Sequence, residues 1–157
     1  RFLNSHKIVL EYLEGSDPYH DSLETHFGHL YGGTIFMENS STYESLKSIG
    51  IDLISNDSLR NKITYLYSVW YDYVLSIEQF ASMHISETMN PSISEHLYTI
   101  EFFDRAYPLD VTAIKHSNSF RHSIKLNIML MEYHLNSYER AKTLIENLIK
   151  EIEKELL

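Results

Sequence analysis

Apolar residues recur every three or four positions along most of the chain, which is the spacing of one face of an α-helix. The pattern is longest over residues 59–84 and 120–152. Shorter stretches with the same spacing cover residues 2–14, 19–30 and 93–107. The pattern therefore predicts about five main helices, together with two short helices at corners of the chain.

Glycine, proline and small polar residues mark the expected helix ends in the first half of the chain. Gly15 follows the first helix, and the Asp-Pro pair at residues 17–18 is typical of the start of the second. Two glycines at residues 32–33 end that helix. The Ser-Thr-Tyr-Glu run at residues 41–44 is a capping box, so a short helix is predicted from there to Gly50.

Further along the chain, Asn56 is expected to cap the longest helix, with Ser55 as the alternative cap. The Asn-Pro pair at residues 90–91 is predicted to break that helix. A second capping box at residues 92–95 is expected to start another helix, which Pro108 ends.

Two segments of the sequence are similar to each other. Each predicts a short helix, a turn and a long amphipathic helix, and Asp110 and Asn118 are the expected caps in the second copy. From Leu59, which matches Phe120, the register between the copies is constant. The sequence thus predicts an all-α fold, an antiparallel helical bundle built from a duplicated short-helix/long-helix unit, with residues 1–157 as a single domain. The expected core lies on the two long helices: Leu59, Ile63, Leu66, Trp70, Ile77, Phe120, Ile124, Ile128, Met131 and Leu135.

Composition excludes several classes of function. The formal net charge of −9, without any cluster of lysine and arginine, argues against binding to nucleic acid or to anionic lipid. The chain has no cysteine, which excludes disulfides, thiolate metal sites and a cysteine nucleophile. It contains no nucleophile elbow, phosphate loop, dinucleotide fingerprint or zinc-protease motif. We therefore expect no enzyme activity, assign no catalytic or cofactor-binding residue, and expect no cofactor.

Arg60 and Arg121 occupy equivalent places in the two copies, in the first turn of each long helix. A cation is unfavourable there because the helix dipole is positive at that end. The favoured interpretation is structural: each arginine holds a corner by bonding to carbonyl groups of the preceding segment or to a nearby carboxylate. The alternative is a site for an anion.

Histidines offer the weak metal candidates. His26 and His29 are three positions apart on the second predicted helix and share a face. No further ligands at a readable spacing accompany them, so we expect no metal site and interpret them as hydrogen-bonded packing residues. His6, His84 and His134 fall in or beside apolar stripes and are expected to be bonded core residues.

Tyrosines gather around the single tryptophan in the longest predicted helix. Tyr67, Trp70 and Tyr71 offer an aromatic ligand pocket between helices as one interpretation. The favoured one is a core periphery whose hydroxyl groups reach water or a partner. From residue 65 to residue 75 the helix is apolar on nearly every side, which predicts a helix surrounded by others.

Most of the chain resembles a bacterial family of domains of unknown function. The likeness is closest over residues 17–75, and its carrying residues are His26, Phe27, Phe36, Asn39, Thr42, Tyr43, Leu46, Lys47, Ser48, Gly50, Leu53, Ile54, Asn56, Leu59 and Arg60. Members carry a basic stretch and one transmembrane helix ahead of this domain. The resemblance implies a soluble part of an inner-membrane protein, on the periplasmic side, with the membrane helix missing ahead of Arg1.

These observations favour a non-enzymatic interaction domain of a membrane-tethered bacterial protein. Its partner would be another protein or a second copy, with no nucleic acid involved. An exposed apolar patch is expected along helix 2–14 or the C-terminal helix. The alternative is a bundle that senses a small ligand or a metal.

Overall fold

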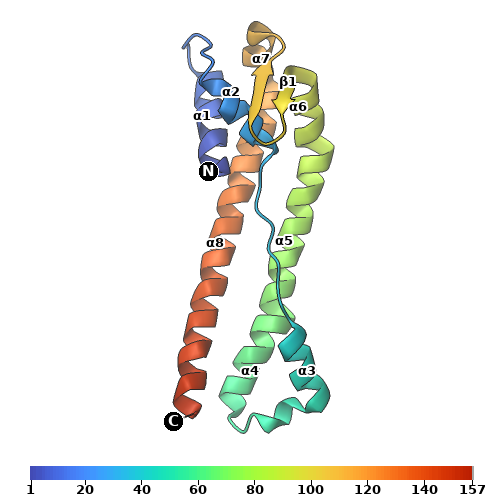
Figure 1. Cartoon of the computed structure of the whole chain (residues 1–157), viewed down its shortest axis with the longest axis vertical. Coiled ribbons are helices and arrows are strands. Elements are labelled where there is room, and N and C mark those ends of the chain that lie inside the picture. Colours follow the sequence, from blue (N-terminus) through green and yellow to red (C-terminus); the bar gives the residue numbers. More distant parts are fainter. Residues whose placement is uncertain (157) are drawn as a thin grey trace. The chain divides into compact units, whose positions relative to one another are not determined.

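The computed structural model (Figure 1) describes residues 1–156 and is mostly helical, with one small sheet. The described chain divides into two compact units. Unit 1 contains Arg1–Thr34 and Phe80–Tyr133, and unit 2 contains Ile35–Gln79 and the described residues from His134 onward. The long helix α8, Asn118–Glu155, contributes its first part to unit 1 and the remainder to unit 2.

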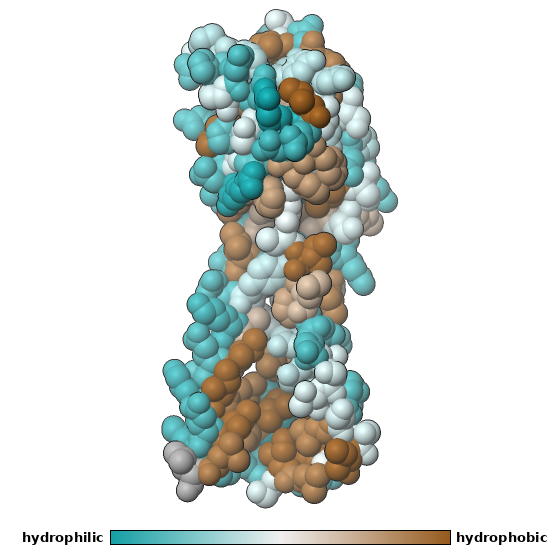
Figure 2. Space-filling view, in the orientation of Figure 1, coloured by the Kyte–Doolittle hydropathy of each residue, from teal (hydrophilic) through white to brown (hydrophobic). Residues whose placement is uncertain are grey.

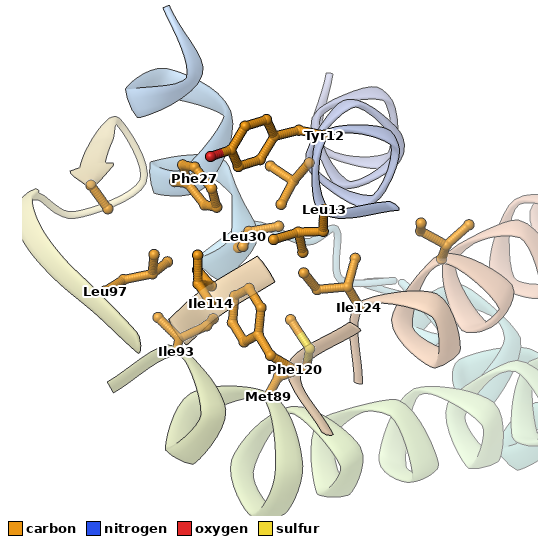
Figure 3. Packing of buried hydrophobic residues seen from close by; sticks show 13 residues of the cluster. Tyr12, Leu13, Phe27, Leu30, Met89, Ile93, Leu97, Ile114, Phe120 and Ile124 are labelled. Carbon is orange, nitrogen blue, oxygen red and sulfur yellow. The ribbon is translucent and has the colours of Figure 1, made fainter. Parts of the chain in front are cut away.

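Unit 1 contains helices from both ends of its sequence and the sheet. Its elements are α1 (Phe2–Glu14), α2 (Leu23–Gly28), the short 3-10 helix η1 (His29–Tyr31), the end of α5 (Tyr71–His84), the π-helical turn η4 (Ile85–Met89), α6 (Asn90–His96), β1 (Leu97–Glu101), β2 (Arg105–Pro108), α7 (Val111–His116) and the start of α8. Their apolar faces form one core (Figure 3). Its fully buried centre includes Phe27, Ile93, Ile114, Phe120 and Ile124.

Unit 2 is built from the middle of the chain and the end of α8. Its elements are α3 (Ser41–Ile49), the 3-10 turn η2 (Ile51–Leu53), α4 (Asp57–Tyr65), the π-helical turn η3 (Leu66–Trp70), most of α5 and the second part of α8. Lys62 pairs with Glu151 in this unit, and Glu78 bonds to Tyr138. Residues later in the α4–α5 segment therefore contact residues earlier in α8, so these two segments run antiparallel.

Three local expectations about helix ends are confirmed. Gly50 ends α3 with φ of 129°, a conformation that favours glycine. Asn56 caps α4, because its side-chain oxygen accepts a hydrogen bond from the Leu59 N–H at 3.1 Å. Asp110 caps α7 by accepting from Thr112 and Ala113. Each of these signals depends only on neighbouring residues, which explains why the sequence reveals them.

Other helix ends differ from the prediction. The Asp-Pro pair at residues 17–18 does not start a helix, and α2 begins only at Leu23. The 41–44 capping box does not form, since Asn39 Oδ1 accepts from the Ser41 N–H at 3.2 Å and Glu44 pairs with Lys47 instead. Likewise, α8 is capped by Ser117 and not by Asn118: the Ser117 hydroxyl oxygen accepts from the Phe120 N–H.

The Asn-Pro pair at residues 90–91 does not break the helix, contrary to the prediction. Helical structure continues from α5 through η4 into α6, so the predicted capping box at residues 92–95 lies inside a helix. The Asn90 N–H donates to the Ile85 carbonyl, five residues back. A wider π turn just before Pro91 accommodates a residue that has no N–H and whose ring crowds the preceding turn.

The predicted helix over residues 93–107 is also wrong beyond residue 96. Leu97–Glu101 and Arg105–Pro108 pair as an antiparallel hairpin, in which Leu97 lies opposite Pro108 and Tyr98 opposite Tyr107. The register shifts between Thr99 and Glu101, so Ile100 is an extra residue on β1. Along β1, side chains alternate between buried and exposed, which is the period of a strand.

The core prediction is confirmed for most positions on the two long helices. Leu59, Leu66, Ile77, Phe120, Ile124 and Ile128 are buried. The prediction is wrong for Leu135, because 49% of its surface is exposed. The stretch from residue 65 to residue 75 is not surrounded either: Tyr65, Val69 and Tyr73 are exposed on one side of it. Within residues 1–156, no helix combines the length and the apolar character needed to cross a membrane.

Candidate functional site

The hairpin of unit 1 displays aromatic side chains on its outer face. Tyr98 is 54% exposed, and Tyr107 stacks obliquely on it with ring centroids 5.3 Å apart. At the turn, Phe102 is 61% exposed and its ring lies 4.1 Å from that of Phe103. Ile100 and Leu109 extend the exposed apolar surface. We call Tyr98, Ile100, Phe102, Phe103, Tyr107 and Leu109 the hairpin face.

The turn of the hairpin holds Phe103 in an unfavourable conformation. The Asp104 N–H donates to the Glu101 carbonyl at 3.1 Å, which closes a four-residue turn. Phe103, the third residue of this turn, has φ of 64° and is the only described non-glycine residue with positive φ. Glycine or asparagine is the usual choice there, because a bulky side chain is strained in the left-handed region. Phe103 is 44% exposed, so burial only partly offsets this strain.

The inner face of the hairpin is fixed against α2 and η1. A Cβ atom added to Gly28 would lie 2.3 Å from the carbonyl carbon of Asp104, so only glycine permits this approach. Arg105 forms an ion pair with Glu24 on α2, with Nε 3.2 Å from Oε2. The Tyr31 hydroxyl lies 2.7 Å from the Thr99 hydroxyl. The hairpin face is therefore displayed on a firmly attached element.

Acidic side chains lie beside the hairpin face. Glu101 and Asp104 flank the turn, and exposed Glu95 precedes β1. The one cation of the hairpin, Arg105, is bonded to Glu24. Figure 2 shows hydrophobic (brown) and hydrophilic (teal) residues next to each other in the region where Figure 1 places the hairpin. The surface thus combines aromatic rings with a local excess of negative charge.

The sequence prediction missed this face and expected an exposed patch elsewhere. Helix α1 is not such a patch: Val9, Tyr12 and Leu13 are buried, and Leu3 and Leu10 pack against the unit 1 core. The C-terminal helix does expose apolar residues, namely Met129, Tyr133, Leu135, Ile149 and Ile152. The run of aromatic and β-branched residues at Tyr98, Thr99 and Ile100 is the sequence signal that could have indicated a strand.

The metal candidates His26 and His29 lie close together, with ring centroids 6.4 Å apart. Both imidazole rings, however, contact the same serine hydroxyl group. The Nδ1 atoms of His26 and His29 lie 3.0 and 2.7 Å from the Ser5 Oγ. Arg1 Nε donates to His29 Nε2 at 2.9 Å, so the proton of neutral His29 is on Nδ1 and is donated to Ser5. Burial and the Arg1 charge lower the pKa of His29. Among residues 1–156, no cluster of three or more metal-ligating side chains occurs.

His6 is a fully buried, hydrogen-bonded core residue, as predicted. Its Nδ1–H donates to the Phe2 carbonyl at 2.9 Å, and its Nε2 accepts from the Asn127 side-chain amide at 2.9 Å. Burial lowers the pKa of His6 to about 4. His84 and His134 also bond to backbone carbonyls, and burial lowers the pKa of His84. His6 and His84 are therefore neutral parts of the packing near pH 7.

The two arginines of the repeat have different surroundings. Arg60 Nη1 donates to the Ile54 carbonyl at 2.9 Å and lies 3.7 Å from the Asp52 carboxylate, while Nη2 donates to Asp57 at 2.6 Å. These are the contacts expected of a residue that holds a corner. The Arg121 guanidinium donates to the Asn118 side chain in its own first turn.

The tyrosines around Trp70 pack with other aromatic side chains of unit 2. Tyr67 stacks on Tyr43 with ring centroids 4.4 Å apart and an interplanar angle of 7°, and Tyr71 meets its edge at 5.1 Å. Phe36 joins the cluster through Tyr71, and its N–H donates to Glu78 at 2.6 Å. Within the described chain, the buried Trp70 Nε1 has no hydrogen-bond partner.

Comparison with known proteins finds no relative of this chain. The chain matches no protein-family model, no curated protein and no solved structure.

Proposed function

We propose that this chain is a non-enzymatic interaction domain and that the hairpin face is its binding surface. The single observation that carries the proposal is the pair of exposed phenylalanines at the turn. Phe103 is held at positive φ although 44% of its surface is exposed, so burial only partly offsets the strain. Departures from local conformational preference that gain no stability are concentrated at functional sites.

The attachment of the hairpin supports this role. A flexible aromatic loop loses conformational entropy when a partner orders it, whereas a fixed one does not. Gly28 allows close contact between α2 and the turn, and the Arg105–Glu24 pair holds the strand that follows it. Aromatic side chains presented in this way are the usual energetic centres of protein interfaces.

We further propose that the fold arose by duplication and forms an antiparallel bundle. In support, α3 and α7 are short helices that each precede a long helical segment, and Arg60 and Arg121 lie at equivalent starts of these segments. For location, the family resemblance supports a membrane-tethered protein with this domain on the periplasmic side of the inner membrane. Protease protection of the full-length protein in spheroplasts tests the location: cleavage from outside is expected, and complete protection contradicts it.

The binding role is tested by photo-crosslinking in cells that express the full-length protein. A photoreactive phenylalanine analogue replaces Phe102 in one variant and Met37 in the other, since Met37 is an 88% exposed apolar residue of unit 2. We expect a discrete protein adduct from position 102 and none from position 37. Equal labelling at both positions, or no adduct from position 102 in a folded protein, would contradict the proposal.

The second candidate is a small-ligand sensor in unit 2. It is favoured by the buried Trp70 Nε1 donor, because an unpaired buried N–H costs about 1–3 kcal/mol unless something accepts from it. A melting screen with aromatic compounds tests this candidate. A shift that Trp70→Phe abolishes supports it, and the absence of any shift across the library removes it.

A further inference from the structure

We infer that the hairpin face binds a protein segment that carries both apolar and cationic side chains. This inference rests on the proposed function and specifies the chemistry of its partner. The apolar part of the hairpin face is the exposed surface formed by Tyr98, Phe102 and their neighbours on the hairpin. Burying such a surface requires apolar groups from the partner.

Carboxylates beside that surface give the hairpin face its charged part. Glu101 and Asp104 flank the aromatic turn, and Arg105 is already bonded to Glu24. A lysine or arginine of the partner could pair with these carboxylates and lie over the neighbouring aromatic rings, which attract cations. The aromatic and acidic groups therefore select the same kind of side chain.

The same charges argue against the other occupants of an apolar face. A second copy would meet this face with its own equivalent face in a two-fold dimer, and this would bring Glu101 and Asp104 toward their counterparts. Anionic lipid headgroups would also be repelled by these carboxylates, and Arg105 is not free to attract them. A basic, apolar protein segment has neither disadvantage.

The experiment uses a synthetic amphipathic helix of leucine and lysine as the probe, and an equivalent helix of leucine and glutamate as its control. Binding of the labelled probes to the chain is measured by fluorescence anisotropy at low and high salt. We expect the lysine probe to bind and the glutamate probe not to bind. Phe102→Ser should weaken binding by about tenfold or more. Glu101→Gln with Asp104→Asn should weaken it by about threefold at low salt, and less at high salt.

The matched control is Met37→Ser, which removes an exposed apolar side chain far from the hairpin in sequence and should leave binding unchanged. Phe102 is 61% exposed, so its replacement should keep the fold, and circular dichroism verifies this. Lysine-probe binding that Phe102→Ser leaves unchanged overturns the inference. Dimerisation through the hairpin, or binding to phosphatidylcholine vesicles that Phe102→Ser abolishes, overturns it in favour of a second copy or a membrane.

The two proposals fail in different ways. An adduct from position 102 in cells, together with no binding of the lysine probe, rejects the basic partner and keeps the interaction domain. Loss of both signals in a folded protein rejects both proposals.

Discussion

Units 1 and 2 are stabilised by different kinds of interaction. Unit 1 combines one apolar core with buried histidines, and it contains every histidine of the chain except His134. Unit 2 has a smaller apolar cluster that includes Leu59, Leu66 and Leu148, together with stacked aromatic rings and ion pairs such as the one between Lys62 and Glu151. Close backbone packing and buried neutral imidazoles make unit 1 sensitive to added atoms and to acid. Unit 2 holds a single histidine, His134, so acid should affect it less.

The largest effect is expected where α2 meets the hairpin. Gly28→Ala would place a methyl group 2.3 Å from the Asp104 backbone, and a backbone clash cannot be relieved by a rotamer change. We expect the free energy of unfolding to fall by about 4 kcal/mol in chemical denaturation. Gly33→Ala is the matched control, since nothing lies within 4 Å of its added atom, and it should change stability by less than about 0.5 kcal/mol. Equal stability of the two variants would show that the hairpin does not pack on α2 as described.

Acid should destabilise unit 1 by the next largest amount. The pKa of His6 is about 4 in the folded chain and near 6.5 when unfolded, so the unfolded chain binds more protons between these values. The stabilisation by neutral His6 is complete above pH 6.5 and is lost as the pH falls toward 4, a change of about 3 kcal/mol. The lowered pKa values of His29 and His84 act in the same direction.

Hydrogen exchange at pH 7 and at pH 4.5, corrected for intrinsic rates, separates the two units in this test. Opening free energies should fall in α1 and change less in α4. The double variant His6→Leu with Asn127→Leu removes both members of the buried side-chain hydrogen bond, so neither side chain is left without the other, although the Phe2 carbonyl also loses its bond to His6. It should flatten the pH dependence, and an unchanged slope would mean that another group titrates.

Arg60 and Arg121 offer a direct comparison of the two units, since each lies in the first turn of a long helical segment. Arg60→Ala removes bonds to the Ile54 carbonyl and to Asp57, and should cost about 1.5 kcal/mol. Arg121→Ala removes a bond to Asn118 within the same helical turn, and should cost about 0.5 kcal/mol or less. Urea denaturation of both variants measures the difference. A larger loss of stability for Arg121→Ala would mean that Arg121, and not Arg60, holds a corner of the chain.

Sequence reasoning succeeded at some of the helix ends that neighbouring residues decide, and failed at others such as the expected capping box at residues 41–44. Gly50 and Asn56 were assigned correctly because the end of a helix is decided by the conformation and side chain of one residue. It failed at the hairpin because Ile93, Leu97 and Ile100 fit both a helical stripe and a strand. What decides between them is the contact with α2 at Gly28, a residue far away in the chain. The candidate site could not be located before that contact was known.

The smallest predicted effect separates stability from binding on the hairpin itself. Phe103→Gly relieves a positive φ that a bulky residue tolerates poorly, so it should raise the free energy of unfolding by about 1 kcal/mol. Phe102→Gly is the matched control, because Phe102 has no positive φ to relieve, and it should stabilise nothing. Thermal melting measures both variants. If Phe103→Gly instead lowers the melting temperature, packing by Phe103 exceeds its strain, and the conformational argument for a binding role is lost. If Phe103→Gly stabilises the chain and weakens binding of the lysine probe, Phe103 contributes to binding and not to stability.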